Sequence, residues 1–214
     1  MRLRVGVAGP GQHAAVEALR RTAYRQATEF RWNDEAQLAW SAADDAGAVL
    51  VLTEQDSASL LSTVRASAFT DLAQAEAMLE YSLDGMGLDA PLLVASRACT
   101  LPSAARRGLL MHLRRAYVGA ALALPDIRFA ITLVYDGAPR LRSMREAGFV
   151  FHVPVRGWDN EARALTQPLM AVLPRARFAS AIEAMTEMIG DADVAATDAA
   201  AVAAVLRERA GKHP

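Results

Sequence analysis

The chain has almost no cysteine, little excess charge and no long apolar run. Cys99 is the single cysteine among 214 residues, which excludes an intramolecular disulfide and a multi-cysteine metal site. The formal net charge is -1 and the pI is about 6.4, so the chain as a whole does not attract nucleic acid and any basic site must be local. No apolar run approaches the ~18 residues of a membrane span, and the apolar stretch near the first residues is too short for a secretion signal. These absences predict a cytoplasmic protein with no nucleic-acid partner and no membrane span.

The composition is that of a globular protein. The chain is 53% hydrophobic and 22% charged, and its length allows a full core, as one large domain or as one domain with an appendage. Strand-like segments are expected over residues 3–8, 48–53, 60–66, 92–99, 128–135, 149–155 and 167–173. Helix-like segments are expected over residues 12–28, 35–43, 72–81, 107–124, 139–147, 176–189 and 197–209. Strands and helices therefore alternate, as in an α/β or α+β fold.

The division of the chain is expected near residue 174. Residues 1–174 hold the alternating segments, and residues 175–214 hold an alanine-rich helical extension. Residues 191–198 are the most plausible linker, so only the last helix is a candidate for a separable element. Its amphipathic spacing predicts that it docks on the same domain, and a role as a dimer arm stays open.

Residues 92–113 join an apolar strand to a helix through a basic glycine turn, which holds Arg106, Arg107 and Gly108. The first N–H groups of a helix have no partner within the helix, and the helix dipole and the arginines favour an anion there. This order of residues predicts a phosphate-binding turn. The alternative is that the two arginines form only a solvated helix start.

The order of segments over residues 3–173 resembles the GNAT superfamily of N-acyltransferases. The resemblance includes the hairpin, the long central strand, the basic turn with its helix, and a short helix that ends in Arg145-Glu146-Ala147-Gly148-Phe149. It implies a mixed, mostly antiparallel central sheet flanked by helices, here with a C-terminal helical tail. In this family the central strand, turn and following helix bind the pantetheine and pyrophosphate of acyl-CoA.

The turn departs from the family pattern Val-x-Pro-x-x-Arg-Gly-x-Gly-x-Gly. Pro102 and Gly108 match it, whereas Ala105 takes the place of the leading arginine and Leu110 that of the last glycine. A side chain in place of glycine hinders a close approach of the backbone to a pyrophosphate.

More narrowly, the chain looks like the branch that contains acyl-homoserine-lactone synthases and long-chain N-acyl amino acid synthases. The residues that carry this likeness are Tyr24-Arg25, Phe30, Trp32, Asp44-Asp45, Thr63-Val64-Arg65 and Ser96-Arg97. Such enzymes commonly take acyl groups from acyl carrier protein, whose arm carries one phosphate, so a tight pyrophosphate turn is not needed. The branch usually has a glutamate where this chain has Val94, which speaks against lactone synthesis.

The resemblance implies that an amine attacks an acyl thioester. The backbone N–H groups of Ala98, Cys99 and Thr100 are expected to hold the thioester carbonyl. The phosphate is expected to contact Arg106, Arg107, Gly108 and Leu109. The catalytic candidates are Arg97 and Tyr135, of which Tyr135 would replace the family tyrosine whose place Met144 takes. The substrate-binding candidates are Arg25, Phe30, Trp32, Arg65 and Ser96.

Several candidates also have a purely structural explanation. Cys99 could be an acyl-accepting nucleophile, but a buried cysteine usually behaves as a small hydrophobe. The arginines could form structural ion pairs, the aromatic residues could be core, and Tyr135 could be half-buried packing. His112, alone on a helix, is expected to be structural.

The sequence therefore leaves three functions open, two of them enzymatic. The leading hypothesis is an N-acyltransferase that moves a medium or long acyl group from acyl carrier protein or acyl-CoA to a small amine such as an amino acid. The second is an acetyl-CoA-dependent N-acetyltransferase of a small amine or a protein. The third is a non-catalytic GNAT-fold module that binds a ligand or regulates a partner. No permanently bound cofactor or metal is expected, and a homodimer stays open.

Overall fold

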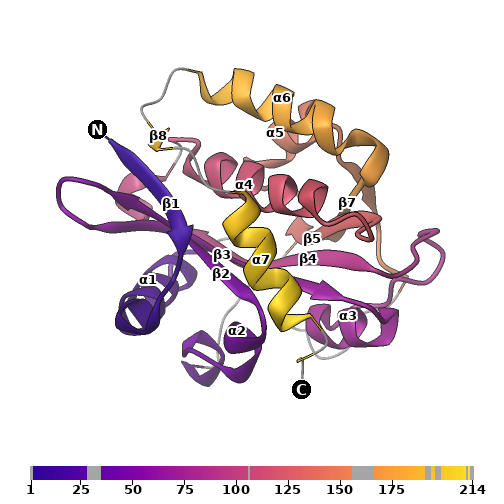
Figure 1. Ribbon diagram of the computed structural model, residues 1–214, viewed down its shortest axis with the longest axis horizontal. Helices are drawn as coiled ribbons and strands as arrows, with labels where there is room; N and C mark the ends of the chain where they lie inside the picture. Colours follow the sequence, from indigo (N-terminus) through magenta and orange to yellow (C-terminus); the bar gives the residue numbers. More distant parts are fainter. Residues whose placement is uncertain are drawn as a thin grey trace.

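The structure is a computed structural model that describes residues 2–27, 35–105, 107–155, 166–190, 194–195, 199–210 and 212. An eight-stranded sheet crosses it in the order β6-β7-β5-β4-β3-β2-β1-β8 (Figure 1). The strands are β1 (Leu3–Val7), β2 (Ala48–Glu54), β3 (Leu60–Phe69), β4 (Leu92–Thr100), β5 (Phe129–Tyr135), β6 (Val150–His152), β7 (Pro168–Pro174) and β8 (Val194–Ala195). Neighbours pair antiparallel except β4 with β5 and β1 with β8. This confirms the predicted mixed, mostly antiparallel sheet.

Helices cover both faces of the sheet. The α-helices are α1 (His13–Tyr24), α2 (Ala42–Ala46), α3 (Leu72–Leu79), α4 (Leu109–Ala123), α5 (Leu141–Glu146), α6 (Phe178–Ile189) and α7 (Ala199–Arg209). Short 3-10 turns are η1 (Pro10–Gln12), η2 (Glu35–Leu38), η3 (Pro102–Ala104) and η5 (Arg175–Arg177). In Figure 1, α1, α2 and α3 lie on one side of the sheet, and α4, α6 and α7 lie on the other.

The larger apolar core lies between the sheet and α4. Leu113, Val118 and Ala121 are completely buried there, since α6 and α7 cover the side of α4 that faces away from the sheet. The C-terminal end of α4 is closed by Arg175, whose Nη1 donates to the carbonyls of Ala121, Leu124 and Ile127 at 3.3, 2.8 and 3.0 Å. A cation at this end satisfies carbonyls that have no partner within the helix and complements the helix dipole.

Both helices of the C-terminal segment pack on α4. Val202, Ala203 and Leu206 of α7 are part of the core cluster that contains α4. A Cβ built on Gly119 of α4 would lie 3.3 Å from the Cβ of Ala199, so the glycine permits a close approach of the two helices. Arg209 at the end of α7 donates to the carbonyl of Gly47 at 2.6 Å.

The helix predicted over residues 35–43 is wrong. The structure has the 3-10 turn η2 there, and a new helix, α2, starts after Ser41. The carboxylate of Asp44 accepts hydrogen bonds from the backbone N–H and the hydroxyl of Ser41, each at 3.0 Å, which forms an N-terminal capping box. Asp44 is therefore a buried helical residue just beyond the end of the helix that the sequence predicts.

Candidate active site

β4 and β5 pair over only half of β4. The parallel register runs from Leu92 opposite Phe129 to Ala95 opposite Thr132. Beyond Ala95, β4 pairs with β3 alone, whereas β5 continues along β7 as far as Tyr135. The loss of pairing opens the middle of the sheet at this point.

A β-bulge lies on β4 at the same place. Thr63 pairs with Cys99 and Arg65 with Ser96, so Arg97 and Ala98 together lie opposite the single residue between their partners. Arg97 has a φ of 52°, a left-handed conformation that side chains other than glycine rarely adopt. A bulge leaves backbone groups out of the ladder and turns a side chain in a new direction. It therefore provides backbone N–H groups and re-aims the Arg97 side chain beside the opening.

Two cavities meet at this opening. The larger one, of about 290 Å³, lies on the side of α1 and α3 and is lined by Tyr24, Arg65, Met78, Leu79, Glu80, Ala95, Ser96, Arg97, Ala98, Thr132, Leu133, Tyr135 and Arg140. The smaller one, of about 20 Å³, is lined by residues of α4 that include Leu110, Leu113 and Tyr117. Both are also lined by Ala95, Ala98, Thr132, Leu133 and Arg140. The two cavities thus share a wall at the separated strands, one on the α4 face and the other on the α3 face.

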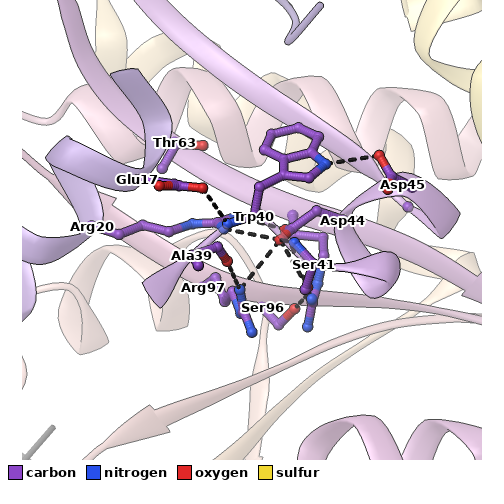
Figure 2. A network of polar contacts seen from close by, with 12 residues as sticks. Glu17, Arg20, Ala39, Trp40, Ser41, Asp44, Asp45, Thr63, Ser96 and Arg97 are labelled. Carbon is purple, nitrogen blue, oxygen red and sulfur yellow. Dashed lines mark hydrogen bonds and ion pairs between the residues drawn. The ribbon is translucent and has the colours of Figure 1, made fainter. Parts of the chain in front are cut away.

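Three arginines converge on Asp44 beside the larger cavity (Figure 2). Arg20 donates to both carboxylate oxygens, with its Nη1 3.0 Å from Oδ2 and its Nη2 2.7 Å from Oδ1. Arg97 Nη1 lies 3.2 Å from Oδ2, and Arg65 Nη1 lies 3.8 Å from Oδ1. One carboxylate thus faces three guanidinium groups that come from α1, β3 and β4.

The charges of this cluster determine its pKa values. Burial by itself would raise the pKa of Asp44, but the hydrogen bonds and charge of Arg20, with the charges of Arg65 and Arg97, lower it overall. Burial, and next the charge of Arg97, lowers the pKa of Arg65 to about 10; burial also lowers the pKa of Arg97. Asp44, Arg65 and Arg97 are therefore ionised at neutral pH.

A second layer of contacts holds the Asp44 segment in place. Glu17 of α1 accepts a hydrogen bond from the backbone N–H of Trp40 at 2.8 Å, and the indole N–H of Trp40 donates to Asp45 at 2.7 Å (Figure 2). The Trp40 ring stacks on His13 with their centroids 3.6 Å apart. Arg97 Nη1 also donates to the carbonyl of Ala39 at 3.2 Å. The cluster is thereby joined to α1 on one side and to β4 on the other.

Many of the residues predicted for the site do lie together. Arg65, Ser96, Arg97, Ala98 and Tyr135 all line the larger cavity. Arg65 Nε donates to the hydroxyl of Ser96 at 3.0 Å, which joins β3 to β4 at the cavity wall.

Cys99 and Thr100 lie just past the cavity. The Cys99 side chain packs against Leu19, Tyr24 and Leu38, and burial raises the pKa of its thiol to about 12. Burial also raises the pKa of Tyr24, and Cys99 adds to this rise. The Thr100 hydroxyl is 2.9 Å from that of Ser62. Cys99 is therefore a small buried hydrophobe in this structure, and only backbone groups of these two residues are candidates for contact with a donor.

The predicted phosphate turn precedes α4. Gly108 is the N-cap of α4 and has a φ of 71°, a backbone conformation that favours glycine. Leu109 is buried, at 3% exposure, and Arg107 is exposed. Arg106 lies outside the described residues, as do Phe30 and Trp32 of the predicted substrate site.

Arg25, a further predicted substrate residue, lies away from the cavity. Its side chain is 67% exposed and its Nη2 is 2.6 Å from Oε1 of Glu35. The α1 arginine that does reach the Asp44 cluster is Arg20, which sequence reasoning missed. Arg20 lies on one helix face with Val16 and Tyr24, both buried, and this four-residue spacing is the signal that could have indicated it.

Two further residues of the cavity were not predicted. Glu80 follows α3, and Arg140 precedes α5; both line the larger cavity. Within the described ranges there is no group of three or more metal-binding side chains. In the same part of the chain, no helix has the length and apolarity needed to cross a membrane.

No protein-family model matches the sequence, and no curated protein matches it. Among solved structures it is similar to a CoA-dependent acyl-homoserine lactone synthase, BjaI, with a TM-score of 0.59, 15% identity, and coverage of 95% of this chain and 99% of that one. It is also similar to FeeM, an N-acyl amino acid synthase from uncultured soil microbes. The TM-score is 0.59 and the identity 13%, with coverage of 88% of this chain and 97% of that one. A third similar structure is FdhC, a nucleotide-linked sugar GNAT. Its TM-score is 0.55 and its identity 9%, with coverage of 88% of this chain and 96% of that one. At these identities the likeness concerns the fold, and the chain has the GNAT fold.

Proposed function

We propose that the protein is an N-acyltransferase that moves an acyl group from a thioester donor to the amine of a small molecule that also carries a carboxylate. The observation that carries the proposal is the opening between β4 and β5, where a bulged strand lies beside two cavities that share lining residues. A donor on the α4 face could reach an acceptor on the α3 face through this opening. Similar folds act on quite different acceptors, so the acceptor must be argued from the cavity itself.

The bulge suits the thioester carbonyl. Amide formation passes through a tetrahedral oxyanion, and fixed N–H donors stabilise that charge. The backbone at Arg97 and Ala98 leaves the regular ladder next to both cavities. We therefore assign the carbonyl to the backbone from Ala98 to Thr100.

The cavity suits an acceptor with a carboxylate. Arg65, Arg97 and Arg140 line it, against the single lining carboxylate of Glu80. Arg65 Nη1 is buried and forms no hydrogen bond in the described structure, and a buried unsatisfied donor favours an acceptor group from a ligand. A guanidinium binds a carboxylate through two parallel hydrogen bonds. At about 290 Å³, the cavity lies near the small end of ligand pockets.

The leaving thiolate needs a proton, and Tyr135 is the proposed donor. Tyr135 lies at the end of β5 and lines the larger cavity, beside the opening between β4 and β5. A positioned acid of this kind contributes about 10²-fold or more to a rate.

The donor we propose is a medium or long acyl group carried by acyl carrier protein or CoA. Leu110 lines the smaller cavity at the position where the GNAT pattern has glycine, which is unfavourable for a tightly held pyrophosphate. This departure from the pattern favours a donor without a pyrophosphate, such as acyl carrier protein, over acetyl-CoA.

The test is thiol release together with mass spectrometry of the product. Acetyl-CoA, decanoyl-CoA and decanoyl-acyl carrier protein are each offered with the twenty standard amino acids, assayed singly. We expect N-decanoyl amino acids and acceptor-dependent thiol release. Transfer from acetyl-CoA alone would indicate the ordinary acetyltransferase. If no donor gives product, the N-acyltransferase proposal is wrong, and a binding role for the fold becomes the better explanation.

A further inference from the structure

Glu80 occupies an unusual backbone position at the edge of the larger cavity. It is the C-cap of α3, with a φ of 57° and a ψ of 31°. This left-handed position at a helix end is usually glycine, because a Cβ makes it unfavourable. Glutamate is less favourable than glycine in this backbone conformation, so we look to the contacts of its side chain for an explanation.

One oxygen of the Glu80 carboxylate accepts no hydrogen bond from the described residues. Its Oε2 is buried and has no hydrogen-bond partner among the described residues, although the side chain lines the cavity. By contrast, Glu76, which lies four residues earlier on α3, accepts a hydrogen bond from the backbone N–H of Leu83 at 2.7 Å. An unpaired buried carboxylate oxygen is costly unless a ligand satisfies it.

Arginines lie across the cavity from this acceptor. The charge of Glu80 acts on Arg97 and raises the pKa of that guanidinium, against the larger effect of burial. Arg65, also on the cavity wall, has a buried Nη1 that forms no hydrogen bond and lies 3.8 Å from Oδ1 of Asp44. The cavity thus has a carboxylate oxygen and a guanidinium nitrogen that form no hydrogen bond among the described residues, which complements a molecule with both an ammonium and a carboxylate.

The chain has no carboxylate on β4 itself. Val94 is completely buried in the apolar cluster that also contains Leu79 of α3, so this part of β4 packs against the end of α3. Glu80 directly follows Leu79. A carboxylate is therefore supplied to the cavity from the adjacent helix end.

The geometry points to Glu80 as the residue that binds the acceptor ammonium and takes its proton. This role rests on the proposed N-acyltransferase function. One proton passes from the ammonium to the carboxylate, and the neutral amine attacks the thioester carbonyl. The C–N bond forms first and gives the tetrahedral oxyanion, and the nitrogen loses its second proton to solvent. The oxyanion then collapses, the C–S bond breaks, and Tyr135 protonates the leaving thiolate. The other titratable groups that face Glu80 around the cavity are Tyr24, Arg65, Arg97, Tyr135 and Arg140.

The experiment compares Glu80→Gln, Glu80→Gly and Glu80→Asp with wild type, using decanoyl-CoA or decanoyl-acyl carrier protein and the amino acid that wild type acylates best. Glu187→Gln, an exposed site on α6, is the control. We expect kcat to fall about 100-fold or more in the Gln and Gly variants, with partial recovery in the Asp variant. Glu80→Gly should be at least as stable as wild type, because glycine relieves the left-handed backbone. A loss of activity in that variant is therefore not a loss of folding.

The pH profile separates proton transfer from positioning. Without the base, kcat of Glu80→Gln should rise about tenfold per pH unit, with the fraction of neutral amine in solution, and wild-type kcat should depend less steeply on pH over the same range. If wild type transfers the acyl group and both Glu80 variants keep its kcat and pH profile, the role of Glu80 is wrong and the proposed function stands. If wild type itself transfers nothing from any donor, both proposals fail together.

Discussion

Arg20 and Asp44 form a two-bond ion pair with both side chains at 0% exposure. The pair joins α1 to α2 across 24 residues of sequence. It holds the carboxylate where Arg97 from β4 and Arg65 from β3 also reach it. Asp44 thus anchors Arg65 and Arg97 at the cavity wall, and its loss should affect stability as well as the site.

We predict that Asp44→Asn strongly destabilises the fold. Removal of one partner from a buried ion pair leaves an uncompensated charge, which costs about 3–5 kcal/mol, and here several buried arginines lose their partner. Urea denaturation measures the change. Asp45→Asn is the matched control, because Asp45 is the exposed neighbour that binds the Trp40 indole, and it should cost about 1 kcal/mol or less. Equal losses in the two variants would contradict the anchoring role.

The same residue predicts how stability changes with pH. The pKa of Asp44 is lowered in the folded protein, so the folded state holds its proton less tightly than the unfolded state does. The stabilisation is therefore fully present above the unfolded pKa, near 4, and is lost as the pH falls through the folded value. The free energy of unfolding, measured between pH 7 and pH 3, should fall more for wild type than for Asp44→Asn. Parallel curves would show that Asp44 is not the titrating group.

Local sequence signals predicted most of the fold. A helix was expected from residue 72, and the carboxylate of Asp71 caps it by accepting a hydrogen bond from the backbone N–H of Ala73 at 2.9 Å. The signals failed at residues 35–43, where apolar spacing favours a continuous helix. There the chain is fixed by contacts with distant residues, such as Glu17 with Trp40 and Arg20 with Asp44. Periodicity does not report such partners.

The sequence predicted several residues of the site but not the features that depend on strand register or burial. Family resemblance indicated Arg65, Ser96 and Arg97, so these residues were found. The bulge that re-aims Arg97 depends on the register between two strands, which no single segment encodes. Glu80 looks like an ordinary helix-end residue in the sequence, and only its buried, unpaired oxygen distinguishes it. The resemblance indicated Arg25, which is exposed, and did not point to Arg20, which is buried and reaches Asp44.

Cys99 should be inert in the native protein. Burial raises the pKa of its thiol to about 12, so at pH 8 only roughly one molecule in ten thousand carries the reactive thiolate. Reaction with a disulfide reagent such as DTNB should be slow in buffer and fast in urea. Cys99→Ala should keep its acyltransfer activity. Rapid native labelling that also abolishes activity would instead support a nucleophilic cysteine.

Tyr135→Phe tests the proton donor to the leaving group. The variant removes only a hydroxyl from the cavity wall, and kcat should fall about 10²-fold if that hydroxyl protonates the thiolate. A thioester of an aromatic thiol, whose thiolate leaves more readily, should reduce the difference between the variant and wild type. An equal loss with both donors would assign Tyr135 to packing or substrate binding.

Leu206→Ala tests whether the C-terminal helix folds together with the rest of the chain. Leu206 of α7 is 1% exposed and belongs to the core cluster shared with α4. Truncation of a buried leucine costs about 2–5 kcal/mol, so one cooperative transition should move to lower urea concentration. Arg207→Ala is the control, because Arg207 is the next residue on the same helix and is exposed; it should change stability by about 0.5 kcal/mol or less. If α7 is a separable arm, the main transition will stay in place in both variants, and only a small, separate transition will respond to Leu206→Ala.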